Sequence, residues 1–259
     1  MNALNEQTAE AAPENLIPRN PSIAPDESTS RFSSALWYNK VREKSIILAG
    51  CGGIGSYVGF LLGRMKPQML TLYDSDVVEV GNLSGQLFGM RDVGRHKVYA
   101  LQERITDLDA YHLLYCINRK FTPTSPGGPI MICGFDNMAA RGIFYTKWKE
   151  ELERGRVPAE QYLFVDGRLA AEEFQVFAIT GDNKAAMQRY EKDFLFPDEE
   201  AEATLCSYKQ TSYMANMIGS VIVNIFTNFC ANECGLVFPR EVPFLTTYRA
   251  DYMDFKIER

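Results

Sequence analysis

Histidine is scarce in this chain of 259 residues, which contains only two, His96 and His112. So few imidazoles leave little material for a histidine-based zinc site or for a Ser-His-Asp triad. The six cysteines form no CxxC pair, and the nearest two, Cys230 and Cys234, are separated by three residues. This spacing argues against a structural zinc knuckle, so we expect no structural metal.

The chain also lacks long apolar runs and basic clusters. Its longest apolar stretch near the C-terminus, residues 217–226, is interrupted by Asn224 and is too short to span a bilayer. The first residues have neither the basic region nor the apolar core of a secretion signal. The 27 basic residues are outnumbered by 33 acidic ones, which leaves no basic stripe for nucleic acid. These absences predict a cytoplasmic protein that binds neither membranes nor nucleic acids.

Composition places most of the chain in one globular unit. Hydrophobic residues make up 46% and charged residues 23%, which is ordinary for a folded domain. Residues 1–30 hold four prolines and many small polar residues, which indicates a flexible N-terminal arm. We expect residues 31–259 to form a single domain.

Compact apolar runs alternate along the chain with segments of helical spacing. Strands are predicted at 45–50, 69–74, 111–121, 129–136, 162–169 and 174–180, with one or two more within 244–258. Helices are predicted at 31–44, 56–65, 94–109, 138–155 and 210–232, and residues 181–203 are predicted to be a long surface segment. This order predicts a Rossmann-like, doubly wound α/β fold. Its mostly parallel sheet has helices on both faces, and antiparallel strands come late in the chain.

A glycine turn follows the first predicted strand, with glycines at positions 50, 52, 53 and 55. Glycine lets the backbone approach a phosphate closely, and the start of the next helix offers free N–H groups. Asp74 ends the second strand about 20 residues later, where a carboxylate can accept hydrogen bonds from a ribose. The pattern predicts an adenine-nucleotide site and leaves NAD and ATP both open.

Further motifs follow this turn in a fixed order. GCGGIGS, DSDVVEVGNLSGQLF, GRHKV and GFDNMAAR resemble the motifs of the ubiquitin-activating-enzyme superfamily, whose bacterial members are the ThiF and MoeB adenylyltransferases. The resemblance runs from about Arg31 to Cys230. It implies a ThiF-type domain that uses ATP and Mg²⁺ to adenylate the C-terminal carboxylate of a small ubiquitin-like (ThiS- or MoaD-like) protein or of a peptide. It also implies a homodimer.

The resemblance assigns roles to individual residues. The nucleotide would be bound by Gly50, Gly52, Gly53, Gly55, Asp74, Asp76, Asn82, Gln86 and Lys97. Among these, Asp74 would hold the ribose and Lys97 would neutralise the triphosphate during catalysis. Asp136 would position Mg²⁺, which prefers oxygen ligands, and Arg141 is expected to be structural.

The segment after Cys206, SYKQTSYMANMIGSVIVNIF, resembles the region that follows the catalytic cysteine of thioester-forming members. A thiol just before a helix has its thiolate favoured, so Cys206 is a candidate for thioester formation, and a thiol packed under a loop is the alternative. Asp166-Gly167-Arg168 is interpreted as a strand-end turn with a salt bridge, in preference to a contact with the substrate tail or a dimer partner.

Two departures from the family pattern keep other functions open. Gly85 stands where members usually have an arginine within Asn-Leu-x-Arg-Gln, and Ser34 where many have one that reaches the partner subunit's nucleotide. Both departures favour a nucleotide-binding pseudoenzyme or scaffold as an alternative. An NAD-linked oxidoreductase would also fit the glycine turn and Asp74, but it leaves Lys97 and Asp136 without a role.

Overall fold

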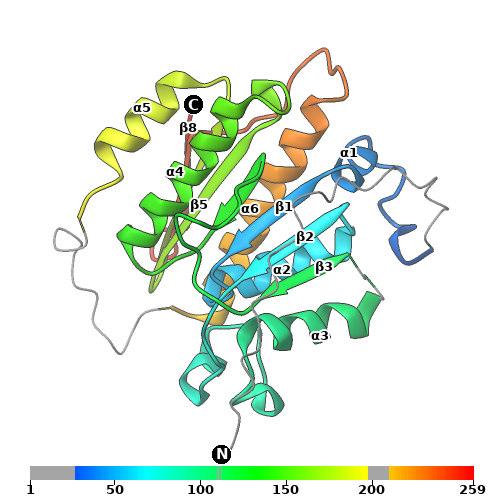
Figure 1. Cartoon of the computed structure of the whole chain (residues 1–259), viewed down its shortest axis with the longest axis vertical. Coiled ribbons are helices and arrows are strands. Elements are labelled where there is room, and N and C mark those ends of the chain that lie inside the picture. Colours follow the sequence, from blue (N-terminus) through cyan, green and yellow to red (C-terminus); the bar gives the residue numbers. More distant parts are fainter. Residues whose placement is uncertain (1–26, 110, 112, 198–209) are drawn as a thin grey trace, which may run out of the picture.

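The computed structural model describes residues 27–109, 111, 113–197 and 210–259 (Figure 1). In this part of the chain, eight strands form one sheet in the order β3-β2-β1-β4-β5-β6-β7-β8. The strands are β1 (Ser45–Ala49), β2 (Met69–Tyr73), β3 (Leu114–Ile117), β4 (Ile130–Cys133), β5 (Leu163–Ala170), β6 (Glu173–Thr180), β7 (Leu245–Arg249) and β8 (Asp254–Glu258).

The direction of pairing changes at β5. Strands β3, β2, β1, β4 and β5 pair in parallel, whereas β5, β6, β7 and β8 pair in antiparallel fashion. Strands β1 and β4 are almost wholly buried, as expected for parallel strands covered on both faces. The predicted Rossmann-like sheet with late antiparallel strands is confirmed.

Helices cover both faces of the sheet. They are α1 (Tyr38–Arg42), α2 (Gly53–Met65), α3 (Lys97–Asp109), α4 (Met138–Arg154), α5 (Lys184–Asp193) and α6 (Ser212–Asn232). Short 3₁₀ turns are η1 (Glu27–Thr29), η2 (Val80–Ser84), η3 (Met90–Asp92) and η4 (Ala159–Gln161). One core cluster joins the sheet to α2, α3 and α6, and a second, rich in aromatic side chains, joins it to α4 and α5 (Figure 1).

Two predicted segments differ from the structure. The surface segment expected at 181–203 contains α5, whose start is capped by Asn183 and which buries Met187 and Tyr190. Most residues of α5 are charged or polar, and for this reason the sequence pattern indicated a surface segment without a helix. Only Tyr38–Arg42 (α1) of the helix expected at 31–44 is helical. The residues before it form turns, in which the ring of Phe32 packs against the rings of Trp37 and Tyr38.

Helix α6 is long and apolar enough to cross a membrane by length and composition. It packs against α2, β5 and β6, and 67% of its most apolar stretch is buried. Gly219 allows the close approach, because a Cβ at this position would lie only 3.0 Å from the Cβ of Tyr57 on α2. In this fold α6 is therefore a core helix.

Candidate active site

The glycine turn between β1 and α2 is tightly wound. Gly50 has a φ of +84°, a conformation that side chains disfavour. A Cβ at Gly55 would lie 1.7 Å from the carbonyl oxygen of Gly50, so position 55 requires glycine. Helix α2 begins at Gly53, and the first N–H groups of a helix have no partner within it. The turn thus presents backbone donors at the carboxyl end of β1.

Asp74 follows β2 and lies beside this turn. Its Oδ2 accepts a hydrogen bond from the Cys51 N–H over 2.6 Å, and its Oδ1 accepts one from the Asp76 N–H over 2.8 Å. Burial raises the pKa of the Asp74 carboxyl above its ordinary value, and these two donors and the nearby Lys97 charge offset only part of that effect. The carboxylate is positioned against the backbone of the glycine turn, and its contact with a ribose stays a prediction.

Lys97 begins α3 and reaches the same edge of the sheet. Its N–H donates to the Asp76 carbonyl oxygen over 2.9 Å, and its Nζ lies 3.0 Å from Asp76 Oδ2. The Lys97 side chain is only 8% exposed, whereas that of Asp76 is 62% exposed. A bridge between Val77 and His96 holds the two segments together. Lys97 is thus a buried cation next to Asp74 rather than a solvated surface lysine.

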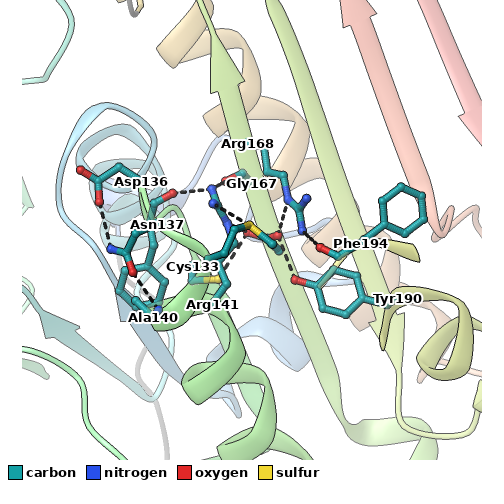
Figure 2. Close-up of polar contacts among 12 residues, drawn as sticks. Cys133, Asp136, Asn137, Ala140, Arg141, Gly167, Arg168, Tyr190 and Phe194 are labelled. Carbon is teal, nitrogen blue, oxygen red and sulfur yellow. Dashed lines mark hydrogen bonds and ion pairs between the residues drawn. The ribbon is translucent and has the colours of Figure 1, made fainter. Parts of the chain in front are cut away.

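Asp136 follows β4 and is exposed to solvent. Asn137 donates to its Oδ1 over 3.2 Å and, through its own Oδ1, caps α4 by accepting the Ala140 N–H (Figure 2). Because the residue is exposed, the Asp136 carboxylate is accessible to a cation from solvent. Within the described residues, no group of three acidic, histidine or cysteine side chains could hold a metal. A single carboxylate such as Asp136 fits Mg²⁺ when substrate phosphates supply further oxygen ligands, so its role as a Mg²⁺ ligand stays a prediction.

Arg141 fixes the segment that carries Asp136. Its Nη2 donates to the carbonyl oxygen of Phe135, the residue just before Asp136, and its Nε donates to Asp166 on β5 over 2.9 Å. Asp166 is fully buried and also accepts from Arg168 over 2.8 Å and from Tyr190 over 2.9 Å (Figure 2). The expected salt bridge is therefore present. The expected strand-end turn is wrong, because β5 continues to Ala170.

Asn82 and Gln86 were both predicted to bind the nucleotide, and they differ in their contacts within the chain. Asn82 Oδ1 accepts the Glu79 N–H over 2.9 Å and thereby shapes η2. Gln86 Oε1 is buried and has no hydrogen-bond partner among the described residues. The amide of Gln86 approaches the turn, since a Cβ at Gly52 would lie 3.8 Å from its Nε2.

One residue of this site was not found from the sequence. Gln210, two residues before α6, places its amide against the turn: a Cβ at Gly53 would lie 1.9 Å from Gln210 Oε1. Nothing in the local sequence around Gln210 signals this contact, because its partners are brought near only by the packing of α6 on α2.

Five of the six cysteines lie among the described residues as free thiols. Cys206 lies outside the described residues. Cys51 and Cys133 are buried and their pKa values are raised well above the ordinary thiol value, first by desolvation, and burial raises the pKa of Cys116 to about 12. These three thiols stay protonated at neutral pH, which fits a packing role.

Comparison with known proteins gives one family and several partial relatives. The ThiF family profile matches residues 26–257. Ubiquitin-like modifier-activating enzyme 5 of Dictyostelium discoideum is 35% identical over 72 residues, which cover 28% of this chain and 19% of that protein. The ATP-dependent ubiquitin transferase-like protein Cap2 of Enterobacter hormaechei is 31% identical over 136 residues, which cover 49% of this chain and 22% of that protein. The matches thus span about a fifth of these relatives' length.

Solved structures share the fold. PaaA superimposes with a TM-score of 0.70 at 14% identity, covering 93% of this chain and 76% of that one. Escherichia coli MccB crystallised with ATP gives a TM-score of 0.65 at 14% identity, covering 86% and 66%. The family profile spans nearly all of the described residues, including the turn, Asp74, Lys97 and Asp136. This chain belongs to the ThiF family.

Proposed function

We propose that this protein is an ATP- and Mg²⁺-dependent adenylyltransferase that activates the C-terminal carboxylate of a small ubiquitin-like protein or of a peptide. The observation that carries the proposal is the juxtaposition of the glycine turn, Asp74 and Asp136 at the carboxyl ends of neighbouring strands, with Lys97 tied to the same edge. Open α/β sheets bind their ligands at that edge.

In the proposed reaction, a carboxylate oxygen of the partner attacks the α-phosphorus of ATP. A new O–P bond forms while the bond from the α-phosphorus to the bridging oxygen breaks, and pyrophosphate leaves with that electron pair. The carboxylate is already ionised, so neither a general base nor a nucleophile of the protein is needed. The protein contributes positioning and charge neutralisation.

The chain supplies this neutralisation from fixed groups. The start of α2 carries partial positive charge, and the buried Lys97 ammonium can exchange Asp76 for a phosphate oxygen. Because Lys97 is desolvated, its charge acts on phosphate with little screening by water. Asp136 would hold Mg²⁺ together with the phosphates, and the ion supplies further positive charge there when bound.

The relatives leave two classes of carboxylate substrate. The names of modifier-activating enzyme 5 and Cap2 point to ubiquitin-like proteins, whereas MccB has been crystallised with MccA as well as with ATP. A thioester at Cys206 would be a second step, in which the thiolate displaces AMP from the acyl-adenylate. That step uses a residue distant in sequence from the adenylation groups and can be tested separately.

ATP–pyrophosphate exchange tests the proposal. Labelled pyrophosphate should enter ATP only when Mg²⁺ and a suitable carboxylate partner, such as a β-grasp protein ending in Gly-Gly, are both present. Calorimetry that detects NAD binding and no binding of ATP with Mg²⁺ would overturn the proposal in favour of an NAD-linked oxidoreductase. ATP binding without exchange would favour a scaffold, the alternative supported by Gly85 and Ser34.

We also propose that the protein is a homodimer in the cytoplasm. The apolar residues of the predicted helix at 210–232 would favour a dimer if they needed a partner subunit to cover them. They do not supply this reason, because α6 is buried against α2 and the sheet of its own chain. Exposed apolar side chains remain elsewhere, at Val237 and Phe238 after α6 and at Tyr252 and Met253 between β7 and β8. Light scattering should give twice the chain mass of 29.3 kDa, and a monomer at micromolar concentration would contradict the dimer.

A further inference from the structure

Gln210 occupies the space above the start of α2. Its Oε1 would lie 1.9 Å from a Cβ at Gly53, and its Nε2 would lie 3.0 Å from the same atom. The residue itself is half-buried, and its backbone pairs with Ala171 in an isolated bridge at the end of β5. Thr211, the next residue, caps α6 through its side chain. The bridge to Ala171 and the cap at Thr211 therefore fix the backbone of Gln210. Its side-chain amide points toward the glycine turn.

The same side chain explains why position 85 is glycine. A Cβ at Gly85 would lie 2.8 Å from Gln210 Cγ and 3.0 Å from its Nε2. The backbone does not demand glycine there, because φ is −130°, which any residue adopts. Any larger side chain at 85 would instead compete with Gln210 for one volume. An arginine at 85 is therefore incompatible with the observed conformation of the Gln210 side chain, and one of the two side chains would have to move.

A second amide points to the same place. Gln86 lies beside Gly52, and its Oε1 is buried without a hydrogen-bond partner in the described part of the chain. Two neutral amides therefore flank the first turn of α2, where backbone N–H groups and the helix dipole favour an anion. A buried polar atom without a partner is costly, and because Gln86 Oε1 is an acceptor, a donor on the ligand such as a nucleotide hydroxyl would satisfy it, whereas a phosphate would not.

We propose that Gln210 is a positioning residue for the nucleotide triphosphate: once its amide turns over so that Nε2 rather than Oε1 faces the turn, it donates to a phosphate oxygen from the volume that an arginine at 85 would fill. This proposal rests on the proposed function. Gln210 would supply a hydrogen-bond donor to the phosphates in place of the arginine that Gly85 replaces. A neutral amide offers one donor group where a guanidinium offers a charged fork. Charge neutralisation consequently falls more heavily on Lys97 in this chain.

Calorimetric titration of the full chain with ATP and Mg²⁺, and separately with adenosine, tests this assignment. Gln210→Ala should weaken ATP binding about tenfold and leave adenosine binding unchanged, because only the phosphate contact is lost. The nearly isosteric Gln210→Glu should weaken ATP binding further, since a carboxylate faces the phosphates. Gln175→Glu, on a half-buried glutamine of β6, is the matched control and should behave as the wild type.

Steric exclusion gives an independent test. Gly85→Arg alone should disturb ATP binding because it collides with Gln210, whereas Gly85→Arg combined with Gln210→Ala should bind ATP at least as tightly as wild type. Wild-type ATP affinity in Gln210→Glu, or tighter binding in Gln210→Ala, would overturn the assignment; the second result would make Gln210 a plug that ATP displaces. Failure of the wild-type chain to bind ATP would instead sink the proposed function itself.

Discussion

The Nε of Arg141 on α4 lies 2.9 Å from Oδ1 of Asp166 on β5, and the Nη2 of the same guanidinium donates to the Phe135 carbonyl oxygen. One arginine therefore connects a fully buried carboxylate to the backbone next to Asp136. The side chain that would bind Mg²⁺ is exposed, but the segment that carries it is anchored in the core. Removing the anchor should disturb both folding and catalysis, whereas removing Asp136 should disturb catalysis alone.

Asp166→Ala should destabilise the fold strongly. It leaves the guanidinium of Arg141 buried and removes a partner from Arg168, and breaking a buried ion pair on one side costs about 3–5 kcal/mol. Urea unfolding followed by circular dichroism measures the loss. The control is Glu258→Ala, which removes an exposed pair with Arg189 and should cost about 0–1 kcal/mol. Equal, small losses in both variants would show that the Asp166 network does not stabilise the fold.

Lys97→Ala and Asp136→Ala should each lower the rate of ATP–pyrophosphate exchange by at least about 100-fold, because each removes charge stabilisation from the reacting phosphates. Both variants should keep the wild-type unfolding midpoint within a few degrees. Lys149→Ala, which removes an exposed lysine paired with Glu191, is the control and should exchange normally. Normal exchange in Asp136→Ala would exclude the proposed Mg²⁺ role.

Cys206→Ala should leave exchange nearly intact while abolishing a covalent adduct with the partner protein that reducing agent releases. The reason is that adenylation needs no thiol, whereas a thioester needs this one. Gel electrophoresis with and without reductant measures the adduct, and Cys234→Ala, a half-buried thiol at the end of α6, is the control. An unchanged adduct in Cys206→Ala would mean that the enzyme stops at the acyl-adenylate. Loss of exchange with a retained fold would show that Cys206 also serves adenylation.

As the pH falls, nucleoside binding should weaken at a higher pH than it would if Asp74 had the pKa of an ordinary aspartate. Burial raises the pKa of Asp74 above 3.8, so the carboxylate is protonated, and stops accepting a ribose hydroxyl, at a higher pH than usual. Titration with adenosine, which carries no phosphate to confuse the profile, measures this step. Asp74→Asn should bind adenosine more weakly and without the step.

The same shift has a defined sign for stability. Because the folded chain binds the Asp74 proton more tightly than the unfolded chain, this group makes folding less favourable as pH rises from 3.8 through its raised pKa. Chemical denaturation across that window, in wild type and in Asp74→Asn, should show a difference that changes with pH. Parallel stability curves would contradict the assignment of a raised pKa.

Local sequence patterns were sufficient for the parallel half of the fold. The apolar runs that became β1, β2 and β4, and the glycines at 50 and 55, each carry their signal within a few neighbouring residues. The same holds for Asp74 and Asp136, which the strand ends place at one edge. Helix α5 was missed because charged and polar residues dominate it, although the three residues that it buries, Ala186, Met187 and Tyr190, lie on one face.

The remaining site features depend on tertiary packing. The Asp166 network joins residues of α4, β5 and α5, and no spacing rule relates Arg141 to Tyr190. Gln210 likewise meets Gly53 and Gly85 only because α6 docks on α2. The sequence showed that Gly85 stands where the family usually has an arginine. It did not show that Gln210 fills the space beside Gly85, because the two residues are far apart in the chain and leave no local pattern.

The docking of α6 on α2 also bears on how the chain is made. Helix α2 ends at Met65, whereas α6, which covers its apolar side, ends at Asn232. Translation at about 5–20 residues per second takes roughly 10–30 s to cover that interval. During this time the side of α2 around Tyr57 lacks α6, the helix that covers it in the folded chain, so this surface stays uncovered until the last part of the domain has been made.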